Sequence, residues 1–351
     1  MIKVLIVEDS VVAQEFLKHI LTSDPAIQVV GIANNGEEAI ELVRQKKPDV
    51  ITMDIYMPKM DGFETTRRIM ETLPTPIVIV SGIGRIKEAA YTFKLLEAGA
   101  LTVVLRPPAF DNPGNKAAVD ELIATVKLMS EVKVVRRERS LKSRDMKAEI
   151  IKTTEAVGGI ALIAIGASAG GPQALQKLLS RLPRDLSVPV LIVQHIAAGF
   201  VEGFADWLGG SILLPVHIAA RGEKPLPGHC YIAPDNFHMG VGHDLRIVLS
   251  SNEPKNGSQP SVAYLFHSVA DVLGPHAVGV LLTGMGRDGA IELKEMKDKG
   301  AATFAQNKES SVVFGMPGEA VKLDAATYIL SPEEIADNLA ALVKKTDGGY
   351  L

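Results

Sequence analysis

The sequence predicts two α/β domains in succession, each a doubly wound parallel sheet with helices on both faces. Two observations favour this class. Short apolar runs alternate along the chain with segments whose apolar residues recur at helical spacing. The chain has 351 residues, which exceeds one average domain and allows two domains with a hydrophobic core each.

The first predicted domain spans residues 1–128 and alternates five strands with five helices. Its strands are expected at 3–7, 28–33, 50–53, 77–80 and 102–105, and its helices near 11–22, 37–46, 61–73, 86–98 and 116–130. This alternation predicts a five-stranded parallel sheet. Ligands of such sheets bind beyond the carboxyl ends of the strands, so the residues that follow each strand are candidates for a site.

Acidic residues follow two of these strands. Glu8 and Asp9 end the first strand, and Asp54 ends the third. Converging carboxylates repel one another unless a cation neutralises them, and oxygen ligands of this kind suit Mg²⁺. The cluster therefore indicates phosphoryl chemistry on one carboxylate. Ser81 and Arg106 end the fourth and fifth strands, where a hydroxyl and a cation would hold phosphoryl oxygens.

The same positions resemble a known family. The matching motifs are Val7-Glu8-Asp9-Ser10, Met53-Asp54-Ile55-Tyr56-Met57-Pro58, Asp61-Gly62, Val80-Ser81-Gly82 and Arg106-Pro107. Together they resemble a response-regulator receiver domain. The resemblance implies that a histidine kinase phosphorylates Asp54, that Glu8 and Asp9 hold Mg²⁺ with it, and that Ser81 is the switch hydroxyl. Arg106 stands where the family usually has Lys, and it spreads the same charge over a planar fork.

Residues 129–157 form a predicted charged linker, rich in Lys and Arg and poor in apolar residues. We expect a solvated connector there. The alternative is a basic arm for nucleic acid or an acidic partner. The net charge of −4 gives no overall attraction to nucleic acid, so we expect no nucleic-acid partner.

The second predicted domain spans residues 158–351 and is also doubly wound. Its strands are expected at 160–165, 188–193, 211–216, 228–232, 245–249, 277–282, 302–305 and 327–330. Its helices are expected after Pro172, from near Gly199, and at 262–273, 289–299 and 332–345. A short hairpin-like piece is expected near 228–250.

A glycine-rich turn, Gly166-Ala167-Ser168-Ala169-Gly170-Gly171, links the first of these strands to a helix. It holds one hydroxyl, that of Ser168, near the unpaired N–H groups of a helix N-terminus. A serine in this place is a candidate nucleophile if a histidine and a carboxylate reach it. The alternative is a turn that only permits close packing or holds a phosphate.

Two more strand ends supply the partners that a nucleophile needs. His195 directly follows the apolar strand segment Val190-Leu191-Ile192-Val193-Gln194, and Asp288 lies just past the strand at 277–282. We expect His195 to take the proton of Ser168 and Asp288 to orient the imidazole. The backbone N–H groups of Ala169 and Met285 are candidates for an oxyanion hole. Among the remaining histidines, His238 is a weak candidate for the lining of the site.

The whole second domain also resembles a known family. The matching motifs are Gly166-Ala167-Ser168-Ala169-Gly170-Gly171-Pro172, Val193-Gln194-His195, Ile232-Ala233-Pro234, Pro260-Ser261-Val262, Leu282-Thr283-Gly284-Met285-Gly286-Arg287-Asp288-Gly289-Ala290 and Gly315-Met316-Pro317. They resemble the chemotaxis protein-glutamate methylesterase family, in which a receiver domain precedes the esterase. The resemblance implies a catalytic Ser168, His195 and Asp288, no cofactor for the ester hydrolysis, and methyl-accepting chemoreceptors as substrates.

The family's activity is the hydrolysis of glutamate γ-methyl esters with release of methanol, and often the deamidation of receptor glutamines. Three places depart from its usual pattern, namely 196–201, Ala263 and Gly318, and we expect them near the receptor groove. We further expect that the unphosphorylated receiver covers the rim around Ser168 and that phosphorylation opens it.

Two other functions compete with a phosphorylation-controlled esterase. One is a phosphorylation-gated receptor-binding module without turnover. The other is a DNA-binding regulator, which the large, strand-rich second domain disfavours. A single cysteine, Cys230, suits a reducing cytosol, and no apolar run approaches the ~18 residues of a membrane span. The predicted location is the cytoplasm, with no membrane insertion.

Overall fold

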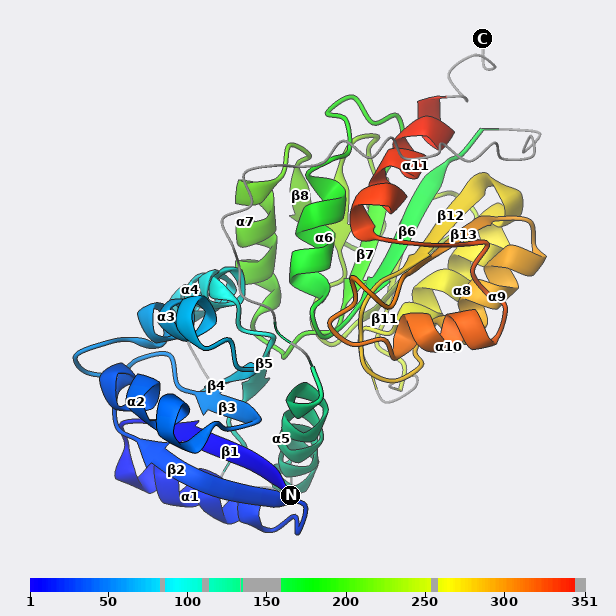
Figure 1. Cartoon of the computed structure of the whole chain (residues 1–351). Helices are drawn as coiled ribbons and strands as arrows, with labels where there is room; N and C mark the ends of the chain where they lie inside the picture. The colour runs from blue at the N-terminus through cyan, green and yellow to red at the C-terminus, as the bar shows by residue number, and fades with distance from the viewer. Residues whose placement is uncertain (83–85, 109–113, 133, 135–158, 254–257, 345–351) are drawn as a thin grey trace. The chain divides into compact units, whose positions relative to one another are not determined.

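The computed structural model describes residues 1–82, 86–108, 114–132, 134, 159–253 and 258–344. The chain divides into two compact units, Met1–Asp145 and Met146–Leu351. Figure 1 shows both units, with labels on most of their helices and strands. Most of the predicted linker at 129–157 lies outside the described residues.

The first unit contains a five-stranded parallel sheet in the order β2-β1-β3-β4-β5. Its strands are β1 (Ile2–Val7), β2 (Ile27–Ala33), β3 (Val50–Met53), β4 (Ile77–Ser81) and β5 (Thr102–Leu105). Its helices are α1 (Val11–Thr22), α2 (Gly36–Lys46), α3 (Gly62–Thr72), α4 (Ile86–Ala98) and α5 (Asn115–Ser130). Helices α1 and α5 contact each other, as do α2, α3 and α4 in turn, which places helices on both faces of the sheet.

The second unit contains a seven-stranded parallel sheet in the order β14-β13-β12-β6-β7-β9-β8, and a separate antiparallel pair, β10-β11. Its strands are β6 (Leu162–Ala167), β7 (Val190–Gln194), β8 (Val216–Ile218), β9 (Cys230–Ile232), β10 (His238–Val241), β11 (Ile247–Ser250), β12 (Ala277–Leu281), β13 (Ala302–Gln306) and β14 (Tyr328–Leu330). The helices are α6 (Gly171–Leu179), α7 (Val201–Ser211), α8 (Val262–Leu273), the short 3₁₀ helix η1 (Gly274–His276), α9 (Ala290–Asp298), α10 (Met316–Lys322) and α11 (Pro332–Lys344).

Strand β6 lies at the centre of this second sheet, between β7 and β12. The chain winds from β6 outward in one direction through β7 and in the other through β12. The crevice of an open parallel sheet lies where the winding direction changes, beyond the carboxyl ends of the strands. The topology therefore brings the residues that follow β6, β7 and β12 to one place.

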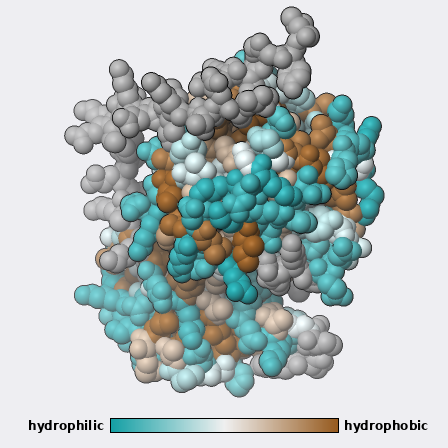
Figure 2. Space-filling view, turned by 90° about the vertical axis from the view of Figure 1, so that its right-hand side faces the viewer, coloured by the Kyte–Doolittle hydropathy of each residue, from teal (hydrophilic) through white to brown (hydrophobic). Residues whose placement is uncertain are grey.

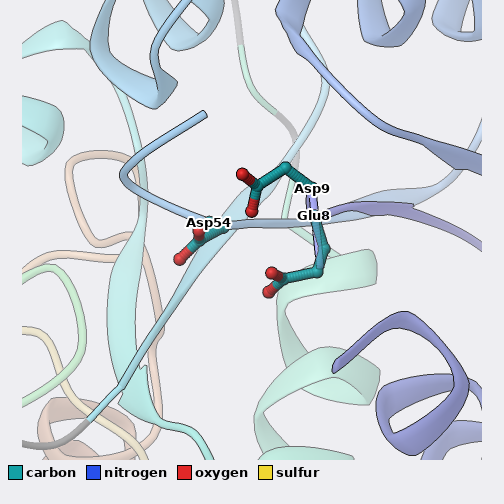
Figure 3. A group of neighbouring side chains, drawn as sticks. All are labelled: Glu8, Asp9 and Asp54. Carbon is teal, nitrogen blue, oxygen red and sulfur yellow. The ribbon is translucent and has the colours of Figure 1, made fainter. Parts of the chain in front are cut away.

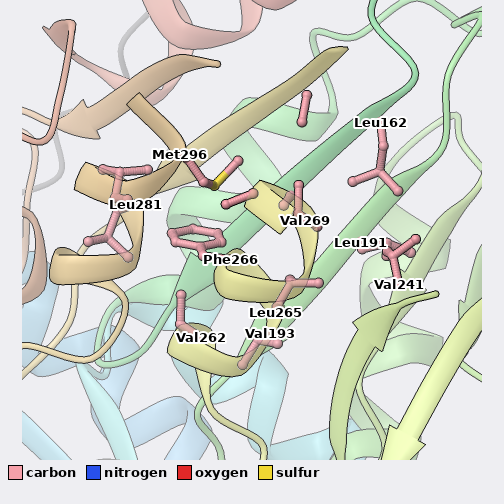
Figure 4. Packing of buried hydrophobic residues seen from close by; sticks show 14 of the residues in the cluster. Leu162, Leu191, Val193, Val241, Val262, Leu265, Phe266, Val269, Leu281 and Met296 are labelled. Atoms are coloured by element: carbon pink, nitrogen blue, oxygen red, sulfur yellow. The ribbon is translucent and has the colours of Figure 1, made fainter. Parts of the chain in front are cut away.

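Helix α8 is fixed to this sheet by a continuous apolar core (Figure 4). Val262, Leu265, Phe266 and Val269 of α8 are fully buried, and they belong to the same cluster as Leu281 of β12. Complete burial of side chains of this size contributes about 1.5–3 kcal/mol each. The start of α8 is consequently a rigid feature of the unit.

The surface mixes hydrophilic and hydrophobic areas, and Figure 2 shows both kinds on one face of the molecule. Scattered exposed apolar side chains are ordinary on a folded protein. None of the described helices combines the length and the hydropathy that a membrane span requires.

The predicted fold class is confirmed, and most predicted strands lie within two residues of their observed positions. The strand expected at 211–216 is wrong. Ser211 ends α7, and β8 begins only at Val216, after Pro215. Proline has no N–H for a ladder, so the paired strand starts beyond it. The antiparallel pair β10–β11 lies within the hairpin-like piece expected near 228–250, although no strand is predicted at β10 itself. The short helix α10 is not predicted.

Candidate functional site

The first candidate site is a group of carboxylates at the ends of β1 and β3 (Figure 3). Glu8 and Asp9 directly follow β1, and Asp54 directly follows β3. Each contributes one carboxylate oxygen, and these oxygens all lie within 4.8 Å of one another. The structure thus brings the three predicted acidic residues together, with Glu8 buried and Asp9 exposed.

Arg106 supplies the positive charge at this group. Its Nη2 lies 2.5 Å from Glu8 Oε2 and 3.5 Å from Asp54 Oδ1. The pKa of Glu8 is raised to about 7, first by burial and then by the Asp54 carboxylate, while Arg106 opposes both. Three carboxylates lie together here beside the Arg106 guanidinium, so their combined charge exceeds that of this one cation.

Ser81 ends β4 beside Arg106, as the sequence predicts. Its side chain is buried, and its hydroxyl donates to the carbonyl of Gly82 at 3.2 Å. The Arg106 N–H donates to the Ser81 carbonyl at 2.7 Å, which holds the two residues next to each other.

The second candidate site begins at Ser168, the first residue after β6. The Ser168 N–H donates to the Thr283 carbonyl at 3.0 Å, and the Thr283 hydroxyl donates to the Ala169 carbonyl at 2.9 Å. Gly171 N–H closes the turn on the Ser168 carbonyl at 2.7 Å. Gly170 has φ +76°, a left-handed conformation that glycine adopts without strain. These bonds fix the turn that carries the Ser168 hydroxyl.

His195 follows β7 and faces a buried acid. Its N–H donates to the Ala167 carbonyl at 2.9 Å, which ties it to the strand end that carries Ser168. Its Nε2 lies 3.0 Å from Asp288 Oδ2. Because Nε2 is the nitrogen bonded to the carboxylate, Nδ1 is the nitrogen that remains for a substrate or a nucleophile. Within the described chain, no hydrogen bond joins His195 to the Ser168 hydroxyl.

Asp288 is 5% exposed and sits at the N-terminus of α8. Its Oδ1 accepts from the Ser261 hydroxyl at 2.9 Å and from Ala263 N–H at 3.2 Å. Its Oδ2 accepts from Val262 N–H at 2.7 Å besides contacting His195. The partial positive charge of a helix N-terminus and several donors favour an ionised carboxylate here.

A cleft of about 640 Å³ opens beside these residues. Its lining consists of His195, Ser258, Met285, Gly286, Arg287, Asp288 and Glu319. Among the described residues, no hydrogen-bond partner occupies the N–H of Ala169 or Met285. The Ser168 N–H is by contrast taken by Thr283, so it is not available to an incoming oxygen.

Gly284 brings the loop after β12 against the nucleophile. A Cβ atom on Gly284 would lie 2.7 Å from Ser168 Cβ and would also collide with Met316. Only glycine permits this approach.

One expectation about the surroundings of the site is corrected. His238 does not line the cleft: it is 1% exposed, and its Nδ1 accepts from Ser261 N–H at 3.2 Å. The expectation that Ala263 and Gly318 lie near the receptor groove stays a prediction. Both are buried, because Ala263 belongs to the first turn of α8 and Gly318 packs inside α10 under Phe314.

Sequence reasoning missed the roles of Ser261 and Thr283. Both stand inside motifs that the sequence displays, Pro260-Ser261-Val262 and Leu282-Thr283-Gly284. A motif gives no direction for a hydroxyl, so the bonds to Asp288 and Ala169 follow only from the fold.

Comparisons with known proteins match both units. The family model described as CheB methylesterase matches residues 163–339, and the response regulator receiver domain model matches residues 4–112. A protein-glutamate methylesterase/protein-glutamine glutaminase of Nitrosospira multiformis is 54% identical over 345 residues, 98% of this chain and 97% of that protein. A protein of the same name, numbered 1, from Syntrophus aciditrophicus is 54% identical over 346 residues, 97% of this chain and 98% of that protein.

One solved structure is similar to the second unit. The CheB methylesterase catalytic domain of Thermotoga maritima superposes with a TM-score of 0.51 at 33% identity. The match covers 53% of this chain and all of that structure, 100% of its length.

Proposed function

This chain belongs to the CheB methylesterase family with an N-terminal receiver domain, and on that premise we propose that it hydrolyses glutamate γ-methyl esters on chemoreceptors under the control of phosphorylation. The observation that best supports an esterase is the hydrogen bond between His195 and Asp288. His195 is also bonded through its backbone to Ala167, the residue before Ser168. Glutamine side chains of the same receptors are a second substrate class, with ammonia in place of methanol.

The proposed reaction has two halves. His195 Nδ1 takes the proton of the Ser168 hydroxyl as Oγ bonds to the ester carbonyl carbon. The imidazolium then gives this proton to the departing methoxide, so methanol leaves and an acyl-enzyme remains. Water attacks the acyl carbon and loses a proton to His195, which passes this proton to Ser168 Oγ as the bond between Oγ and the acyl carbon breaks. The Ser168 hydroxyl is restored, and the glutamic acid product leaves and ionises.

Each residue of the site has a physical role in this sequence. Asp288 holds the Nε2–H of His195 and stabilises the imidazolium that forms in both halves. The oxyanion needs N–H donors, and we assign this role to Ala169 and Met285. Each such donor is worth about 3–4 kcal/mol of transition-state stabilisation.

The receiver supplies control through Asp54. A kinase phosphoryl group transferred to this carboxylate would meet the Ser81 hydroxyl and the Arg106 guanidinium, which flank the strand ends. The phosphorylated receiver then shifts the esterase toward its active state. The kinase, the receptors and the cytoplasmic location are parts of this proposal.

The acidic group fits the magnesium ion that receiver chemistry implies. Glu8, Asp9 and Asp54 would hold it, because clustered carboxylate oxygens are the donors that Mg²⁺ prefers. Burial, and after it the Asp54 carboxylate, raise the pKa of Glu8 to about 7, and a bound cation would offset both effects. When bound, the ion would neutralise charge on the carboxylates and on an incoming phosphoryl group.

The test is methanol release from methylated receptor membranes. Ser168→Ala should lower kcat by at least about 10⁴-fold, because the nucleophile acts as a unit with His195 and Asp288. Ser180→Ala, an exposed serine that ends α6, is the matched control and should keep wild-type turnover. Equal methanol release by Ser168→Ala and wild type would contradict the proposed serine esterase mechanism. No methanol release by either would favour a receptor-binding module without turnover.

A further inference from the structure

Ser261 does not do what a serine at its position usually does. It is the N-cap residue of α8, yet its side chain accepts no N–H of its own helix. The N-cap residues of α2 and α3, Asn35 and Asp61, do accept from their own helices. An N-cap serine normally accepts from the second or third N–H of its helix. In α8 the carboxylate of Asp288 accepts these N–H groups instead.

The Ser261 hydroxyl donates to Asp288. The serine is fully buried, at 0% exposure, and its Oγ lies 2.9 Å from Asp288 Oδ1. Each oxygen of the carboxylate is thereby held twice, Oδ1 by Ser261 and Ala263, and Oδ2 by Val262 and His195. A carboxylate held at both oxygens cannot rotate without losing several charge-assisted bonds.

A hydrogen bond to the buried His238 fixes the backbone of Ser261. Its N–H donates to His238 Nδ1 at 3.2 Å, and His238 Nε2 lies 3.1 Å from the Glu253 carbonyl. Since Nδ1 accepts, Nε2 carries the proton of a neutral ring. The same ring stacks on Tyr264 of α8, with centroids 5.0 Å apart and planes at 14°.

The next residue is fixed by packing. Val262 fills the space that a Cβ on Gly166 or on Gly289 would need. Gly166 belongs to the strand that leads to Ser168, and Gly289 follows Asp288 directly. The first turn of α8 therefore touches both the nucleophile strand and the loop of the acid.

From these contacts we infer that Ser261 is a positioning residue for the esterase reaction: its hydroxyl orients the Asp288 carboxylate toward His195 Nε2. The inference rests on the proposed function for its kinetic consequence. Ser261 is absent from the lining of the cleft, so it acts through Asp288 and not on the substrate. Its loss should lower kcat and leave KM nearly unchanged.

The kinetic test compares Ser261→Ala and Ser261→Gly with wild type in methanol release. Removal of a hydrogen bond to a buried charge should lower kcat by about 10- to 100-fold, with KM within about twofold. Ser261→Thr keeps a hydroxyl and should recover most of the rate. The control is Ser268→Ala, which removes a hydroxyl from the same helix that bonds to Val241 N–H and not to Asp288.

A second readout needs no turnover. The Nε2–H proton of His195, bonded to a carboxylate, should resonate far downfield in the NMR spectrum of wild type and Ser268→Ala. In Ser261→Ala and Ser261→Gly this resonance should move upfield or be lost. Fluorescence of the single tryptophan, Trp207, which lies in the same unit, reports whether each variant is folded.

The outcomes separate the two proposals. A wild type without methanol release but with a resonance that depends on Ser261 would overturn the proposed substrate and support the positioning role. A folded Ser261→Gly with kcat within twofold of Ser268→Ala and an unmoved resonance would overturn the positioning role. Loss of rate equal in Ser261→Thr and Ser261→Ala would also count against it.

Discussion

Glu8 and Asp288 are both nearly buried carboxylates, at 2% and 5% exposure, in opposite surroundings. Asp288 accepts from a hydroxyl, from two N–H groups of a helix terminus and from His195. Glu8 has one cation, Arg106, and two neighbouring acids. The contacts of Asp288 hold its carboxylate in one orientation. The surroundings of Glu8 favour the binding of a further cation.

The pKa of Glu8 allows a prediction for the magnesium-free receiver. Burial, and then the Asp54 carboxylate, raise this pKa from 4.5 to about 7. Above pH 7 the carboxylate is charged in both the folded and the unfolded state, so the folded state bears the full cost. Below pH 4.5 it is neutral in both states and the cost vanishes. Glu8→Gln should therefore raise the free energy of unfolding by about 1–3 kcal/mol at pH 8 and by much less near pH 5.

Urea unfolding followed by circular dichroism at both pH values measures this gain in the free energy of unfolding, from the transition that belongs to the receiver unit. Glu15→Gln, an exposed position on α1, is the control and should change the free energy of unfolding by less than about 1 kcal/mol. If Glu8→Gln raised the free energy of unfolding equally at pH 5 and pH 8, the charge of Glu8 would not be what destabilises the folded receiver.

At the scale of elements, the loop after β12 and the strand β6 meet at Gly284. Its N–H donates to the Val313 carbonyl at 3.1 Å, and its own carbonyl accepts from Gly315 and Met316. The loop is thus paired on one side while its Cα lies against Ser168 on the other. A side chain at this point has no space to occupy without moving the nucleophile.

Gly284→Ala should consequently lower kcat by about 10- to 100-fold, because small displacements of reacting groups have effects of this size. Gly210→Ala is the matched control: a Cβ there meets open space near the end of α7, and turnover should stay at the wild-type value. Methanol release and the unfolding midpoint of both variants measure the effect. An unchanged kcat in Gly284→Ala would mean that the loop after β12 can move to accommodate the methyl group and does not fix the position of Ser168.

The same elements show how far a sequence predicts this site. Ser168 and His195 directly follow the neighbouring strands β6 and β7 of one sheet, and Asp54 directly follows β3 of the other. Within each sheet the parallel topology is enough to predict which strand-end residues lie together. The donors to Asp288 are different, since two of them are backbone N–H groups at the start of a helix. Their direction depends on how α8 packs on the sheet, which long-range core contacts decide. For the same reason the sequence does not show that the N–H of Ala263, in the first turn of α8, donates to Asp288.

At the scale of the whole molecule, one chain carries a phosphoryl-accepting unit and a hydrolytic unit. Each unit has its own sheet and its own site at the carboxyl ends of the strands. The central claim is that the receiver unit controls the esterase unit. Asp54 is the residue at which that control should begin.

The most direct measurement is methanol release from methylated receptor membranes by the full-length chain with Mg²⁺, with and without acetyl phosphate. Wild type should release methanol several-fold faster with the phosphodonor, and Ser168→Ala should release none in either condition. Asp54→Asn should keep the basal rate and lose the stimulation. Stimulation that persists in Asp54→Asn, or a wild-type rate indifferent to the phosphodonor, would contradict phosphorylation control of the esterase.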